Sequence, residues 1–140
     1  MRFILIAISG KKYDDEVYEV VLPTMDGRIG VMADHMPLFS VISPGAIAVR
    51  KNERDPDSSI EYFATYGGAI EVSDNNLKVL VDEAHRPEEI NEIEAQEAME
   101  RAERVKSEAK DQSSLEQAQA MIDRQAVRLQ VASLKHRRRH

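Results

Sequence analysis

The sequence predicts a mainly β fold with a helical extension: an antiparallel β-sandwich or barrel followed by an antiparallel two-helix hairpin. All six glycines and all seven Phe and Tyr residues lie at or before Gly68, and no proline follows Pro87. Glycine and proline mark turns, and aromatic residues favour pleated, half-buried surfaces. The chain therefore divides into a β domain, residues 1–84, and a helical domain, residues 85–140.

The first domain is predicted to contain a series of short strands. Segments rich in β-formers recur at intervals of roughly 8–12 residues with turn residues between them, as in an all-β sandwich or barrel. The predicted strands cover residues 2–9, 16–22, 28–33, 38–42, 46–51, 60–66, 69–72 and 77–81. Leu77, Val79 and Val81 fall on one side of the last segment, opposite Lys78. Such a sheet buries one face and leaves the other available.

Alanine-rich stripes at helical spacing predict two helices after residue 88. The stripes contain Ile90, Ile93, Ala95, Ala98, Ala102, Val105 and Ala109, and then Leu115, Ala118, Ile122, Ala126, Leu129 and either Ala132 or Ser133. The polar residues 111–114 separate them, with Asp111 or Ser113 forming the turn and Ser113 or Ser114 capping the second helix. Alanine buries little apolar area, so we expect the hairpin to dock weakly on the sheet.

Composition restricts the classes of partner. Residues 1–84 carry 8 Lys and Arg against 14 Asp and Glu, which argues against general nucleic-acid binding. The chain has no cysteine, which excludes disulfides and fits a reducing compartment. Its longest apolar run, residues 3–8, is far shorter than the roughly 20 residues of a membrane-spanning helix, so membrane association should come through a partner. The basic end suits an acidic protein surface; it comprises Arg124, Arg128, Lys135, Arg137, Arg138 and Arg139.

No residue pattern predicts an active site, a metal site or a cofactor. Asp34 and His35 could form an acid–base pair, but no Ser, Cys or second His lies near them in the sequence. Histidine and cysteine spacings typical of metal ligands do not occur. The paired glycines at 27 and 30 and at 67 and 68 open no predicted helix, so we interpret them as turns and tight strand crossings rather than phosphate loops.

Three segments together resemble the epsilon subunits of bacterial F-type ATP synthases, which are homologous to the mitochondrial delta subunit. Residues 19–38, EVVLPTMDGRIGVMADHMPL, resemble the family pattern LPgeeGefGvlpgHaPLlt. Residues 43–50, SPGAIAVR, resemble kPGvvriR. Residues 66–72, YGGAIEV, followed by VLVDEA at 79–84, are similar to sGGflEV and vtvLaDtA. Their order and spacing, and the hairpin after them, extend the resemblance over essentially the whole chain.

The resemblance implies a sandwich of about ten strands and a role without catalytic residues. It implies a rotor subunit in the central stalk of the proton-transporting ATP synthase, peripheral at the cytoplasmic face of the bacterial plasma membrane. The sandwich would bind gamma and the c-ring and couple their rotation. The mobile hairpin would extend along gamma to the alpha and beta subunits and inhibit ATP hydrolysis.

The resemblance also implies which residues meet these partners. The segment that faces gamma and the c-ring corresponds here to Gly27, Arg28, Ile29, Gly30, His35, Pro37 and Leu38. Arg28 stands where the family usually has an acidic residue, and Asp34 where it usually has glycine.

The alternative function is nucleotide sensing by the hairpin. Some bacterial family members bind ATP through a pattern like I/L-D-x-x-R-A together with arginines of both helices. Here the pattern carries Asn91 for the aspartate and Glu94 for the arginine, and a carboxylate repels phosphate. The remaining basic candidates for nucleotide or beta-subunit contacts are Arg101, Arg104, Arg124 and Arg128. We therefore predict that nucleotide binding is absent or very weak.

Overall fold

The structure is a computed structural model that describes residues 1–138, with side chains described up to residue 134. Within that range the chain forms ten strands, two α-helices and two short 3-10 helices. The strands are β1 Arg2–Ala7, β2 Gly10–Glu16, β3 Glu19–Thr24, β4 Gly27–Met32, β5 Leu38–Ile42, β6 Gly45–Arg50, β7 Glu61–Thr65, β8 Gly68–Ser73, β9 Asn76–Val81 and β10 Ala84–His85. The helices are η1 Asp57–Ser59, η2 Pro87–Glu89, α1 Glu92–Glu108 and α2 Gln112–Arg138.

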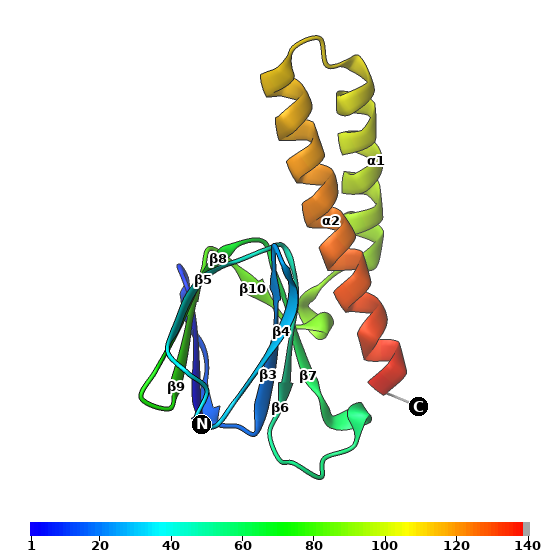
Figure 1. The fold of residues 1–140 in the computed structure, drawn as a ribbon. Coiled ribbons are helices and arrows are strands. Elements are labelled where there is room, and N and C mark those ends of the chain that lie inside the picture. Colours follow the sequence, from blue (N-terminus) through cyan, green and yellow to red (C-terminus); the bar gives the residue numbers. More distant parts are fainter. Residues whose placement is uncertain (139–140) are drawn as a thin grey trace.

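The strands form a nearly closed, two-layered sheet beneath a projecting hairpin (Figure 1). One layer contains β10, β7, β6, β3 and β4, and the other contains β5, β8, β9, β1 and β2. The two layers are joined where Thr24 of β3 pairs with Ile42 of β5. Strand β1 pairs with β9 in parallel and with β2 antiparallel. The predicted sandwich with a C-terminal helical hairpin is therefore confirmed.

The core lies between the layers because apolar residues alternate along the strands. Phe3 and Leu5 of β1 and Leu77 and Val79 of β9 are fully buried there. Phe63 of β7 faces them from the opposite layer. All residues of this core cluster lie at or before Ala84, so no helical side chain described here, up to residue 134, belongs to the sandwich core.

Two of the ten strands are absent from the series predicted from the residues alone. Strand β2 includes part of the segment 9–12 that we predicted as a turn. Its residues GKKYDDE are mostly polar because both of its faces are largely exposed, so no apolar alternation marks it. It is held by pairing with β1 and by the contact of Arg2 with Asp14, whose Nε and Oδ1 are 2.9 Å apart. Strand β10 has two residues, which is too short for a periodic signal, and it spans the boundary expected at residue 84.

The helices begin later than residue 88, at positions set by side-chain caps. The Asn91 side chain accepts a hydrogen bond from the Glu94 amide, which starts α1 at Glu92. The Asp111 side chain accepts one from the Ser114 amide, so Asp111 caps α2, and the prediction of Ser113 or Ser114 as the cap was wrong. The predicted apolar stripes are partly wrong too. Ala95, Ala102 and Ala118 are buried, whereas Ile93, Val105 and Ala126 are exposed.

Candidate functional site

The residues expected to meet gamma and the c-ring are spread along one edge of the sandwich. Gly27 and Arg28 lie at one end of β4, beside the turn at Met25 and Asp26. The loop with His35 and Pro37 follows the other end of β4. At the usual rise per strand residue, the two ends of β4 are about 17 Å apart. Ile29 and Gly30 lie between, and Leu38 begins β5. The set therefore makes two separate regions rather than one site.

The Asp34 and His35 pair has no acid–base geometry. Asp34 has a φ of 65°, and its amide donates to the Asn75 side chain at 3.1 Å. The His35 Nδ1 lies 2.7 Å from the Met36 carbonyl oxygen. Among the described residues, no group of three His, Asp or Glu side chains is arranged to hold a metal ion. None of the described helices is both long and apolar enough to cross a membrane.

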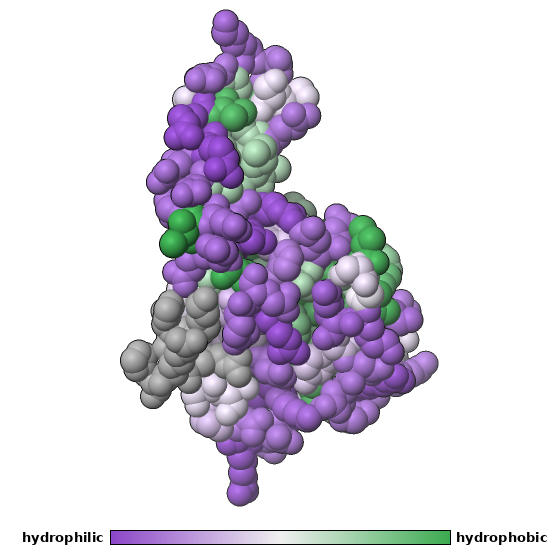
Figure 2. Space-filling view, turned by 180° about the vertical axis from the view of Figure 1, so that it is seen from behind, coloured by the Kyte–Doolittle hydropathy of each residue, from purple (hydrophilic) through white to green (hydrophobic). Residues whose placement is uncertain are grey.

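The outer face of the second layer carries a row of exposed and half-buried apolar side chains, which we call the apolar face: Ile6, Phe39, Val41, Ala69 and Leu80. Register places Val41 beside Ala69, Ala69 beside Leu80, and Leu80 beside Ile6. Phe39 is 75% exposed, Val41 60% and Leu80 47%. Hydrophobic atoms gather on the sandwich on the side away from the hairpin (Figure 2). This contiguous apolar face is a candidate interaction site.

Sequence reasoning missed this face. The segment Leu38–Ile42 is apolar on both of its sides, which is a signal for a strand covered on both faces. The alternation of residues along a strand does not reveal that one of its two apolar sides stays exposed in this chain.

The hairpin docks on the other layer through one end of α2. Val127, Val131 and Ala132 of α2 are buried against Ala46 of β6 and Ala64 of β7. Ile90, just before α1, joins the same cluster, which is flanked by Tyr62 and Tyr66. We call this cluster the seam. The end of the hairpin that joins α1 to α2 projects beyond the sandwich (Figure 1).

Polar side chains border the seam, and we call them the clasp: Tyr66, Glu83, His85, Arg124 and Arg128. The Arg124 guanidinium lies over the Tyr66 ring, 4.0 Å from its centroid, and also pairs with Glu83. The Tyr66 hydroxyl is 2.9 Å from His85 Nδ1. Arg128 Nη1 is 3.4 Å from that hydroxyl and 3.5 Å from the same His85 nitrogen. Burial, and after it the Arg128 charge, lower the pKa of His85 below its usual 6.5.

The four arginines expected on the hairpin do not converge. Arg101 and Arg128 border a shallow depression of about 390 Å³ between α1 and α2, together with Glu94 and Glu97. Arg124 instead contacts the sandwich, and Arg104 is exposed on α1. The two carboxylates oppose binding of an anion in this depression. The side chains of residues 135–140, which include the other four members of the basic end that we expected to meet an acidic surface, lie outside the described part of the structure.

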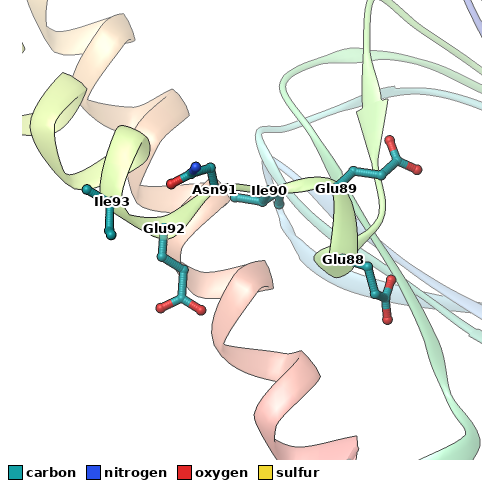
Figure 3. Close-up of a pocket in the computed structure, with 6 residues that line it drawn as sticks. All are labelled: Glu88, Glu89, Ile90, Asn91, Glu92 and Ile93. Atoms are coloured by element: carbon teal, nitrogen blue, oxygen red, sulfur yellow. The ribbon is translucent and has the colours of Figure 1, made fainter.

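The segment joining the sandwich to α1 forms a second depression, of about 430 Å³ (Figure 3). Its carboxylates, from Glu88, Glu89 and Glu92, lie apart from one another in the close-up and do not converge. Ile90 is buried in the seam, whereas Ile93 is 72% exposed. Asn91, which stands at the aspartate of the nucleotide pattern, is used as the cap of α1.

Comparison with known proteins gives consistent results. A family model described as "ATP synthase, Delta/Epsilon chain, beta-sandwich domain" matches residues 1–87. The ATP synthase epsilon chain of Herpetosiphon aurantiacus is 36% identical over 124 residues, covering 89% of this chain and 88% of that one. The epsilon chain of Chloroflexus aggregans is 36% identical over 121 residues, covering 86% and 83%.

Solved structures show the same fold. A chain of the Euglena gracilis mitochondrial ATP synthase OSCP/F1/c-ring structure aligns with a TM-score of 0.78 at 22% identity, covering 94% of this chain and 79% of that one. A chain of the Tetrahymena thermophila mitochondrial ATP synthase central stalk/c-ring structure aligns with a TM-score of 0.64 at 12% identity, covering 94% and 96%.

Proposed function

The chain belongs to the ATP synthase delta/epsilon chain family, and we propose that its hairpin restrains ATP hydrolysis while its sandwich carries the rotor contacts. It is a non-catalytic central-stalk subunit of the proton-transporting F-type ATP synthase, a peripheral part of a membrane-associated complex. The two epsilon chains described above that are 36% identical to this chain come from bacteria, which supports a position at the cytoplasmic face of the plasma membrane.

The observation that carries the regulatory proposal is the small seam. Among the described side chains of α2, the apolar contact with the sandwich comes from three short ones, Val127, Val131 and Ala132. A ligand or partner that binds one position of the arm about 5.5 kcal/mol more tightly converts that position from rare to dominant. Contacts with alpha or beta subunits, made through exposed hairpin residues such as Arg101 and Arg104, could supply such a difference.

Truncation tests this proposal. Removing the residues after Glu88 deletes both helices and leaves the sandwich core intact. We expect the assembled complex to hydrolyse ATP faster than the complex with the full chain, with gamma and the c-ring still present at their usual ratio. Unchanged hydrolysis in a fully assembled truncated complex would show that the hairpin does not inhibit.

We assign the rotor contacts to two regions of the sandwich. The Gly27 to Gly30 end of β4, with the exposed Arg28, would face the c-ring. His35, Pro37 and Leu38 lead into β5 and so continue into the apolar face, which would pack on gamma. The roughly 17 Å between the two ends of β4 allows each end to face a different partner.

Charge placed on the apolar face should abolish the gamma contact. Val41→Glu and Leu80→Glu change exposed side chains, so the fold should persist. A buried carboxylate without a partner is costly in an interface, so the stoichiometric complex with purified gamma should be lost in size-exclusion chromatography. Met121→Glu changes an equally exposed residue of α2 and should leave the complex intact. Wild-type-like binding by both face variants would remove the apolar face from the interface.

Nucleotide sensing is the weaker candidate. Arg101 and Arg128 share their depression with Glu94 and Glu97, and Asn91 caps α1 instead of presenting a carboxylate. We expect calorimetry of the isolated chain with ATP, without Mg²⁺, to give no measurable binding. A micromolar dissociation constant would contradict this expectation.

A further inference from the structure

In the clasp, hydrogen bonds connect Arg128, Tyr66 and His85, and the chemistry of Arg128 determines which group donates in each. A guanidinium can only donate, so Arg128 donates toward the Tyr66 hydroxyl and toward His85 Nδ1. Nδ1 must then be an acceptor, and the Tyr66 hydroxyl, 2.9 Å away, donates to it. This arrangement requires a neutral His85 with its proton on Nε2. The docked α2 thus favours the neutral form of this ring.

The charges around His85 come from every element packed against it. Arg128 of α2 and Lys12 of β2 oppose a positive charge on the ring, whereas Glu89 of η2 favours one. Arg124, also from α2, is already paired with Glu83. Burial adds to the cost of charging the ring. Of the cations of α2, Arg128 is therefore the one that opposes a charge on the ring when the helix is docked, and its effect comes after that of burial.

We propose that His85 makes the docking of α2 on the sandwich pH-dependent. A proton on Nδ1 removes the acceptor that faces Arg128 and places two cations about 3.5 Å apart across the clasp. The seam has few other side chains with which to resist that repulsion. Protonation of His85 therefore releases the end of the hairpin from the sandwich.

The direction of the pH dependence follows from the pKa of His85. That pKa is lowered when α2 is docked, and it returns toward the usual 6.5 when α2 leaves, because burial and the Arg128 charge are then removed. Docking is consequently at full strength above about pH 6.5 and weakens as the pH falls through the docked value. Each unit of difference between the pKa of His85 in the docked and undocked states changes the docking equilibrium constant about tenfold.

The use of this equilibrium as a regulatory input rests on the proposed function, but the equilibrium itself can be measured on the isolated chain. The chain has no cysteine, so two spin labels can be placed without background. Glu53→Cys, between β6 and η1, and Gln130→Cys, on α2, change exposed residues on elements that lie near one another. We expect the population at the docked distance to fall as the pH is lowered from 8 to 5.5, a range in which most carboxylates stay ionised.

Variants separate His85 from the other histidines. His85→Gln keeps an acceptor for Tyr66 but cannot be charged, so docking should become independent of pH and stay near its value at pH 8. Arg128→Gln removes the opposing cation and should raise the His85 pKa in an NMR titration of the full chain. His35→Gln, and His136→Gln with His140→Gln, should keep the wild-type response.

Two results would overturn the proposal. The first is a docked population in the wild type that changes less than about twofold over this range. Such a result would show that protonation is not appreciably coupled to the docking of α2. The second is a pH response that survives in His85→Gln, since another group then carries it. Either result would leave the truncation test of hydrolysis unaffected, so the two proposals fail separately.

Discussion

At the scale of single residues, Gly68 shows how closely two strands approach in this sandwich. It begins β8 with a φ of 157° and pairs with Val81 of β9. A Cβ at this position would overlap the carbonyl oxygen of Leu80 and press on the Val81 side chain. The interpretation of this glycine as a tight strand crossing therefore has a steric cause.

We expect Gly68→Ala to lower the free energy of unfolding by at least about 2 kcal/mol, because backbone atoms must move to admit the methyl group. Urea denaturation of the purified chain measures it. Gly30→Ala is the matched control, since a Cβ there meets only the flexible Glu19 carboxylate and should cost less than about 1 kcal/mol. Equal effects of the two substitutions would contradict the steric argument.

At the scale of elements, the two helices of the hairpin have different roles. The buried contacts with the sandwich come from α2 through Val127, Val131 and Ala132. In α1 the buried residues are Ala95 and Ala102, and this helix packs mainly on α2. The two helices can therefore leave the sandwich as one body when the contacts of α2 are broken.

Val131→Ala should weaken docking without unfolding the sandwich, because the residue is fully buried in the seam but lies outside the sandwich core. The expected cost is about 1 to 3 kcal/mol of docking free energy. The spin-label pair at positions 53 and 130 reports it as a loss of the docked distance at pH 8. Val105→Ala, on the exposed side of α1, should leave that distance unchanged. A loss of docking in both variants would point to a general weakening of the helices.

At the scale of the whole molecule, the chain consists of a sandwich with its own core and an arm with little core. The large apolar side chains that are fully buried, such as Phe3, Phe63 and Leu22, all lie in the sandwich. The seam is a separate cluster on its outer surface. This division is what the proposed function requires, because an arm can then move without unfolding the sandwich.

We expect a chain ending at Glu88 to fold alone and to keep the NMR chemical shifts of the full chain at strands far from the seam, such as β1 and β9. Shifts should change at Ala46, Ala64 and Tyr66, which lose their cover. An unfolded spectrum from soluble truncated protein would show that the sandwich depends on the hairpin, contrary to its separate core.

Much of this arrangement could be predicted from local patterns. Turn residues and alternation located eight of the ten strands, and alanine spacing located both helices. Strand β2 could not be found because its polar residues carry no alternation, and its pairing with β1 is a long-range contact. In α2 the buried residues Val127 and Val131 were missed because the predicted stripe ran through Ala118, Ala126 and Leu129, of which Ala126 is exposed.

The sequence by itself determined the fold class and the family, because turn residues, alternation and motif order are local properties of the chain. Only the tertiary structure decided which surfaces can act. It separated Gly27 from His35, left Phe39 and Val41 without a cover, and brought Tyr66, His85 and Arg128 together at one clasp. These residues are far apart in the sequence, and their proximity depends on which strands pair and where α2 lies, which no local pattern records.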